Sequence, residues 1–276
     1  MGIFKETLPK FLRTQIGIRQ HILSVGNNGN QHRLGQSKFG DINIEPGAFF
    51  TNTLSKHCTV RMSSMVDITS SELLDLDLKI GNVQLEKDLV LAGLAQNYML
   101  QGGTLLMPKG AQTPAMRRGF PGKGRPLGGA YGDPLARADG SVDSYGESYG
   151  IVPMPGIQKV NIRTKSAYGS LREGKIDFVC HNLRQLAVME ILYMRPGFPV
   201  LLEWGWTPYI SNSGKIQGSF PYISDLDQFW GRKGKRILVQ SEITDLITTG
   251  KKNTGGNYDA ILGLVKNFSY TARPDG

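Results

Sequence analysis

One pentapeptide in the chain has the spacing of a hydrolase nucleophile. Residues 146–150 read Gly-Glu-Ser-Tyr-Gly and match Gly-x-Ser-x-Gly, with Ser148 at the reactive position. That pattern activates a serine only at a strained turn from a strand into a helix, beside an oxyanion hole. Residues 151–155 read Ile-Val-Pro-Met-Pro and cannot begin such a helix. The sequence therefore predicts no catalytic serine here.

Each of the two cysteines adjoins a histidine, which raises the question of a metal site. The pairs are His57-Cys58 and Cys180-His181. A structural zinc site needs four such ligands around one ion. Adjacent residues on a strand point to opposite faces, so one ion cannot easily use both members of each pair. We expect buried cysteines beside outward histidines, with no catalytic, cofactor-binding or metal-binding residues and no cofactor.

Net charge suggests what kind of partner the chain has. Of 276 residues, 32 are Lys or Arg and 23 are Asp or Glu, a net charge of +9. This surplus favours an anionic partner, such as nucleic acid or an acidic protein face, although solubility alone accounts for it equally well. The basic residues are spread over arms and loops, without zinc-finger or helix-turn-helix spacing. A β-barrel module that binds nucleic acid or another anion is therefore the alternative function.

Three further features bear on the protein's environment. Two cysteines are too few for a disulfide scaffold, which indicates a reducing compartment. No apolar run approaches the ~18 residues of a membrane-spanning helix, so we expect no membrane insertion. The chain ends in Pro274-Asp275-Gly276, a turn signal that normally leads into another strand. We therefore expect the natural polypeptide to continue.

The first 24 residues are expected to form a helical arm. Apolar residues recur there at helical spacing, with a basic side formed by Lys10, Arg13 and Arg19. The segment 26–30, Gly-Asn-Asn-Gly-Asn, ends the helix predicted over 8–23. Three roles are open for this arm: packing on its own core, docking on a neighbouring subunit, or contact with a membrane surface.

The rest of the chain is expected to be mainly β, in an α+β fold. A period of two marks strands, and helical spacing after Asn182 marks one helix over 183–194 that ends at Pro196-Gly197. A turn is expected at 101–103, and a polar and aromatic loop over 207–234. The predicted strands cover 58–68, 74–80, 89–94, 104–107, 157–162, 174–181, 198–206, 236–247 and 258–272.

Residues 108–156 differ from the rest of the predicted domain, 25–276. They are dense in Gly and Pro, and no apolar period is present. A structureless stretch of this length within a compact domain is uncommon, which indicates a functional loop, an insertion ordered by a partner, or a linker. The repeats Ser144-Tyr145-Gly146 and Ser148-Tyr149-Gly150 are typical of an adaptable contact surface. A plain disordered loop is the other interpretation.

The second half of the chain carries a resemblance to a known family. Its segments are Gln158–Ile162, Gly169–Phe178, the helix from Leu183 to Met194, and Arg195–Trp206 with the sequence Arg-Pro-Gly-Phe-Pro-Val-Leu-Leu-Glu-Trp-Gly-Trp. They resemble the tail-tube-like domain of baseplate hub proteins in contractile phage tails. The likeness includes the closing segment from Asn257 to Gly276. It covers 151–276 well and 57–107 loosely, and the loop at 108–156 departs from the family pattern.

The resemblance implies a tail-tube-like β-barrel or sandwich with one helix outside it. It implies a virion protein of the tail baseplate, assembled in the host cytoplasm, whose trimeric or hexameric ring joins the tail tube to the spike and wedge proteins and passes phage DNA through its lumen. We expect assembly contacts at Phe11, Leu12, Arg13, Arg117, Arg118, Tyr145, Tyr149 and Trp206. Core positions are expected at Leu183, Leu186, Ile191 and Trp204.

Overall fold

The structure, a computed structural model, is described here for part of the chain. The described residues are 8–27, 56–66, 95, 98–103, 155–165, 171–181, 183–218, 222–231 and 236–272. The predicted strands over 74–80, 89–94 and 104–107 lie outside them, as do residues 108–154 of the Gly/Pro-rich loop. None of the helices in the described part is long and apolar enough to cross a membrane.

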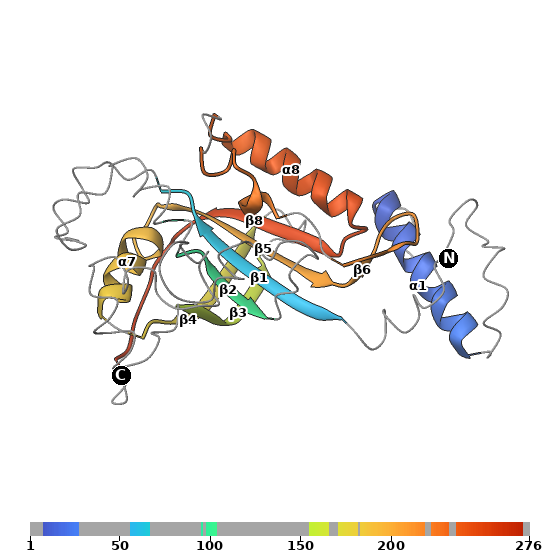
Figure 1. The fold of residues 1–276 in the computed structure, drawn as a ribbon, viewed down its shortest axis with the longest axis horizontal. Helices are drawn as coiled ribbons and strands as arrows, with labels where there is room; N and C mark the ends of the chain where they lie inside the picture. The colour runs from blue at the N-terminus through green and yellow to red at the C-terminus, as the bar shows by residue number, and fades with distance from the viewer. Residues whose placement is uncertain are drawn as a thin grey trace, which may run out of the picture.

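One six-stranded sheet organises the described residues (Figure 1). Its order is β4-β3-β2-β1-β5-β8, and all neighbours are antiparallel except β2 and β3. The strands are β1 (His57–Ser64), β2 (Leu100–Gly103), β3 (Gly156–Thr164), β4 (Arg172–Val179), β5 (Pro199–Thr207) and β8 (Tyr258–Leu264). A short hairpin of β6 (Tyr209–Ile210) and β7 (Ile216–Gln217) forms a second sheet.

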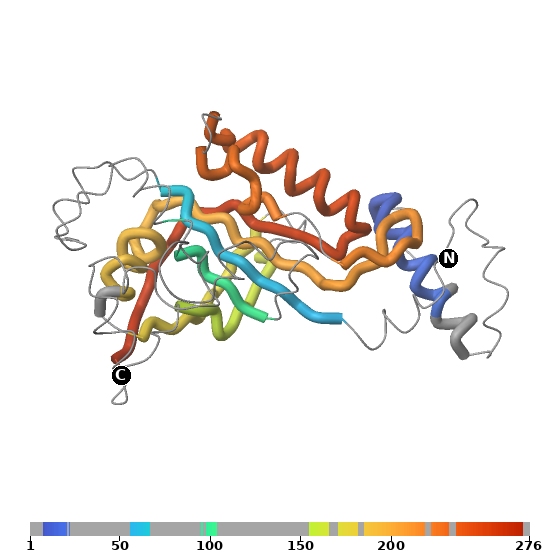
Figure 2. Tube along the Cα trace, in the orientation of Figure 1, coloured from blue at the N-terminus to red at the C-terminus, as the bar shows by residue number. Residues whose placement is uncertain are grey.

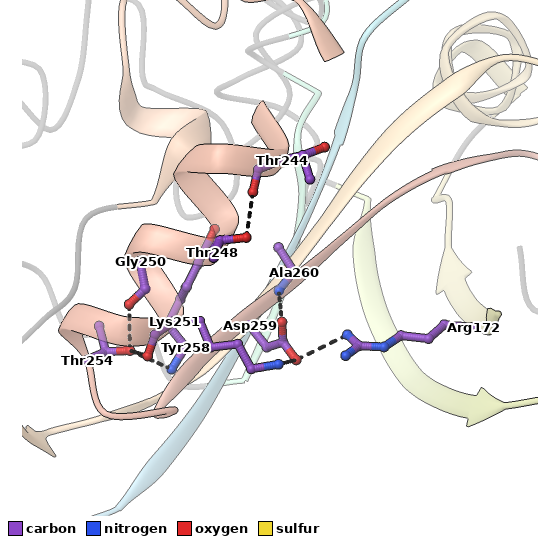
Figure 3. Close-up of polar contacts among 9 residues, drawn as sticks. All are labelled: Arg172, Thr244, Thr248, Gly250, Lys251, Thr254, Tyr258, Asp259 and Ala260. Carbon is purple, nitrogen blue, oxygen red and sulfur yellow. Dashed lines mark hydrogen bonds and ion pairs between the residues drawn. The ribbon is translucent and has the colours of Figure 1, made fainter. Parts of the chain in front are cut away.

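The large sheet curls until its two outer strands approach each other, which makes a nearly closed barrel. Arg172 on β4 donates from Nη1 to Asp259 Oδ2 on β8 over 3.1 Å, as Figure 3 shows. The same Asp259 oxygen accepts from Lys251 Nζ over 2.8 Å. Side chains therefore bridge the two outer strands. The prediction of a mainly β, α+β fold is confirmed in this form.

Alternation along β5 separates the inside of the barrel from its covered outer face. Trp204 and Leu202 pair with Val60 and Met62 of β1 and point inward. Leu202 Cδ2 lies 3.7 Å from where a Cβ on Gly174 of β4 would stand, a contact across the interior. Leu201 and Glu203 point to the opposite face and are buried there.

Two helices flank this sheet, so the expectation of a single flanking helix is wrong. The predicted helix over 183–194 is confirmed as α7 (Leu183–Tyr193), and it lies at one end of the sheet (Figure 1). The Tyr193 hydroxyl lies 3.1 Å from the Met62 carbonyl oxygen and 3.0 Å from that of Tyr98, so its one hydrogen can be donated to either. The outer face of β8 is covered instead by α8 (Gln240–Asn253), through the fully buried Ile243.

The helix α8 replaces a strand predicted over 236–247. Apolar residues alternate there, but Ile243, Leu246 and Ile247 also have helical spacing. Glu242, in the third helical position, accepts the Val239 N–H over 2.9 Å and pairs with Arg236. This contact satisfies one of the free donors at the start of the helix, and an acidic side chain there favours the helix dipole.

Two other predictions of local structure are wrong. Residues 101–103, predicted to be a turn, belong to β2. A Cβ on Gly102 would stand 2.9 Å from the Ile157 carbonyl oxygen of β3, so the glycine there permits close strand approach. The strand predicted over 258–272 ends at Leu264, and residues 265–272 continue outside the sheet.

Candidate functional site

Glu203, in the middle of β5, is the most deeply buried acidic group of the described residues. It is the Glu of the Leu-Leu-Glu-Trp-Gly segment, and none of its surface is exposed. Its Oε1 accepts the Ile223 N–H and the Tyr258 hydroxyl, each over 2.7 Å. Its Oε2 accepts the Ser224 N–H over 3.2 Å. The carboxylate therefore holds the 3-10 turn η2 (Ile223–Asp225) against the barrel.

A second layer of contacts surrounds this carboxylate. The Tyr222 hydroxyl is hydrogen-bonded to the Thr59 hydroxyl of β1. The Arg61 guanidinium lies 3.9 Å from the centre of the Tyr222 ring and donates to Asp225 over 2.6 Å. The cation therefore contacts both an aromatic face and a carboxylate, each of which attracts it. Strand β1 and the turn η2 are thus joined at two adjacent points.

Burial sets the ionisation of the groups around Glu203. Burial raises the pKa of the Glu203 carboxyl, and hydrogen bonds donated by η2 and Tyr258 lower it in part. The pKa of Tyr258 is raised by burial and then by the negative charge of Glu203, so this phenol stays protonated and donates. All three donors to the carboxylate come from this chain. The arrangement suits a structural clamp.

The N-terminal helix α1 (Lys10–Asn27) docks on its own chain, at the far end of the sheet from α7 (Figure 2). The buried Gln15 donates from Nε2 to the Ser211 carbonyl over 2.8 Å. Gly255 and Gly256, with φ of +61° and +79°, form the turn between α8 and β8. A Cβ on Gly255 would stand 2.3 Å from the Gln15 side chain, and a Cβ on Gly256 would stand 2.7 Å from Leu12 Cδ2. This glycine turn therefore forms the seat of α1.

The structure places some of the predicted assembly residues and not others. Phe11 and Leu12 are half-buried on α1, and Arg13 is exposed. Trp206 is 46% exposed on β5, opposite Cys58. The remaining four lie outside the described residues: Arg117, Arg118, Tyr145 and Tyr149. The arm and Trp206 lie toward the same end of the sheet, and the assembly role of all eight residues stays a prediction.

The predicted core residues occupy two elements. Ile191 is buried in α7, and Leu186 of the same helix packs partly buried against the core. Trp204 of β5 is likewise partly buried against it. Leu183 is the first residue of α7. Leu186 and Ile191 of α7 and Trp204 of β5 belong to one apolar cluster, which links the end helix to the barrel.

Sequence reasoning missed an apolar strip where the two outer strands meet. We call it the seam strip: Leu171, Leu264, Phe268 and Tyr270, which are 59%, 68%, 47% and 68% exposed. Leu171 precedes β4, and the others lie at or beyond the end of β8. Lys266 lies 3.7 Å from Glu173, which ties these two segments together. Alternation could suggest that one face of this segment is apolar, but not that it lies outside the sheet.

The cysteine–histidine dipeptides do not come together as a metal centre. Cys58 lies on β1 and Cys180 just after β4; both are free thiols and only half-buried. Burial raises the pKa of both, that of Cys180 to about 11, so the thiols stay protonated. Within the described part of the chain, no three His, Cys, Asp or Glu side chains are placed to hold one metal ion.

The outer face of β3 and β4 bears on nucleic-acid binding. Lys159 lies opposite Asp177, and Arg163 lies opposite Glu173, which also pairs with Lys165. Opposite charges across neighbouring strands offset each other. Lys175, opposite Asn161 on the same face, has no such partner, so cross-strand pairing offsets only part of the positive charge of this face.

Comparison of the chain with protein-family models, with curated proteins and with solved structures found no match.

Proposed function

We propose that this chain is a structural subunit of a contractile phage tail, at or next to the baseplate hub. In this proposal, three or six copies form a ring that joins the tail tube to the spike and wedge proteins. The ring takes part in tail assembly and passes phage DNA through its lumen. The resemblance of 151–276 to tail-tube-like domains supports this, because its segments fall on β3, β4, α7, β5 and β8.

The observation that carries the proposal is the seam strip. Three of its four exposed apolar side chains, Leu264, Phe268 and Tyr270, lie close together in sequence at and beyond the end of β8, and Leu171 lies just before β4. Exposed apolar surface at the end of a sheet favours association with another protein. In the described sheet, β4 pairs only with β3, and β8 only with β5. Outer strands of this kind readily pair with another chain. A second copy seated on the strip would cover both the apolar side chains and the strand edges.

The proposed ring requires a contact between two different surfaces of neighbouring copies. A contact between this strip and a different surface of the next copy is heterologous, and such contacts close into a ring when the rotation allows it. In this proposal α8 covers the outer face of β8, and the next copy contacts the exposed strip at and beyond the end of that strand.

The test is the mass of the purified chain in solution, measured by light scattering during size-exclusion chromatography. The parent is expected as a trimer or hexamer. The double variant Phe268→Ser/Tyr270→Ser is expected as a folded monomer with the circular dichroism spectrum of the parent, because both side chains are exposed. Its melting temperature should fall only by the stability that assembly adds. Ile237→Ser is the matched control: Ile237 is 55% exposed on the segment before α8, and its change should leave the assembly intact. A parent that is monomeric at every concentration contradicts the proposal, as does a double variant that assembles like the parent.

A further inference from the structure

Two basic residues from distant parts of the chain lie at the same end of the sheet, beside the seat of α1. Arg19 of α1 donates from Nη2 to Asn257 Oδ1 over 2.5 Å. The Asn257 carbonyl accepts the Trp206 N–H over 2.9 Å, and Trp206 lies opposite Cys58 at the start of β1. Lys56 precedes that strand by one residue. Arg19 and Lys56 therefore border the row formed by Asn257, Trp206 and Cys58.

Neither cation is neutralised within the described part of the chain. No carboxylate among the described residues forms an ion pair with Arg19 or Lys56. The Arg19 Nε atom is buried without an acceptor. Burial lowers the pKa of Lys56, and the charge of Arg19 lowers it further; burial also lowers the pKa of Arg19. Two like charges and an unused donor held partly out of water are costly unless an anion joins them.

We propose that Arg19 and Lys56 form a binding site for a phosphate group. Because the site holds two cations, the charge of the ligand favours a phosphate over a carboxylate. A phosphate monoester carries a charge of about −1.5 to −2 near neutral pH and offers three acceptor oxygens, so it neutralises both cations. A carboxylate neutralises one of them. The guanidinium presents planar donors to such an oxyanion, and the ammonium acts as a point charge beside it. A bound phosphate would also tie α1 to the start of β1.

This inference does not rest on the proposed assembly role. The test is calorimetric titration of the full chain with inorganic phosphate, with acetate as the carboxylate probe. Phosphate is expected to bind more tightly than acetate. Arg19→Gln and Lys56→Gln are each expected to weaken phosphate binding about tenfold or more, the effect of losing a charged hydrogen-bond donor. Lys10→Gln, which removes an exposed cation from the same helix, should leave the affinity unchanged.

Comparing the two variants separates a loss of phosphate binding from a loss of folding. Arg19→Gln also removes the hydrogen bond to Asn257, whereas Lys56→Gln breaks no hydrogen bond within the described residues. If Lys56→Gln binds phosphate more weakly but melts at the same temperature as the parent, the weaker binding comes from the lost cation and not from unfolding. Deoxyadenosine monophosphate distinguishes the source of the phosphate: affinity equal to that of inorganic phosphate assigns a free ion, and tighter binding assigns a phosphate carried by a nucleotide. Acetate binding as tightly as phosphate, or Lys56→Gln binding phosphate like the parent, would overturn the site.

Discussion

Replacing Glu203 by leucine tests whether hydrogen bonds at this carboxylate hold η2 to the barrel. Leucine fills a similar volume but accepts no hydrogen bond. It leaves three buried donors without an acceptor: the N–H groups of Ile223 and Ser224, and the Tyr258 hydroxyl. Each such donor costs about 1–3 kcal/mol. The opposing effect is the removal of a buried carboxylate, whose desolvation costs several kcal/mol.

The expected balance is a loss of about 2–5 kcal/mol in the free energy of unfolding, because three donors lose their acceptor at once. At roughly 2–4 °C per kcal/mol, the melting temperature should fall by about 5–15 °C. Glu203→Gln is the matched control. The glutamine amide oxygen can still accept from Ile223 and Tyr258, but its amide nitrogen is a donor placed against the Ser224 N–H. The free energy of unfolding should therefore fall by less than in Glu203→Leu, by about 1–2 kcal/mol.

The assay is urea unfolding of the parent and both variants, followed by circular dichroism. The expected order of stability is parent, then Gln, then Leu. If Glu203→Leu proves as stable as the parent, or more stable than Glu203→Gln, then desolvation of the carboxylate outweighs its hydrogen bonds and the clamp is refuted.

The pH dependence of the same measurement has a defined sign. A raised pKa means that the folded protein holds the Glu203 proton more tightly than the unfolded chain does. The resulting stability is fully present below about pH 4, and is lost as pH rises from there through the raised pKa. The stability advantage of the parent over Glu203→Gln should therefore shrink as pH rises, and an advantage that grows with pH would contradict the pKa direction.

Three other changes test the packing around this core. Gly256→Ala puts a Cβ 2.7 Å from Leu12 at a φ of +79°, so it should destabilise the protein by about 1–3 kcal/mol and make α1 more sensitive to limited proteolysis. A double-mutant cycle of Arg172→Gln and Asp259→Asn should give a coupling of about 0.2–1 kcal/mol that decreases in 1 M salt, because the pair is partly exposed; an unchanged coupling would argue against a solvent-screened bridge. Trp204→Ala should cost about 3 kcal/mol, the low end for aromatic truncation since the ring is only partly buried, and a variant that unfolds at the same urea concentration as the parent would exclude Trp204 from the core.

The sequence predicted those elements whose local pattern fits one structure only. Helix α7 follows from the spacing of its apolar residues and the Pro196-Gly197 stop, and β5 from alternation between Val200 and Trp204. Segment 236–247 failed because its apolar residues fit periods of both 2 and 3.6. The Glu242 contacts at the start of α8 favour the helix, and the alternation alone did not reveal this.

The candidate sites depend on tertiary contacts that no local pattern encodes. Glu203 meets donors 20 residues further along the chain, and Arg19 meets Asn257 across 238 residues. The seam strip exists because the sheet curls and the chain leaves β8 at Leu264. Its exposure follows from this closure and not from the apolar character of the residues.

Electron microscopy of the purified chain at high concentration tests the assembly proposal most directly. We expect closed rings of three or six copies, which Phe268→Ser/Tyr270→Ser abolishes and Ile237→Ser leaves intact. Rings that persist in the double variant, or a parent that stays as single particles at every concentration, would contradict the claim that this chain assembles through its seam.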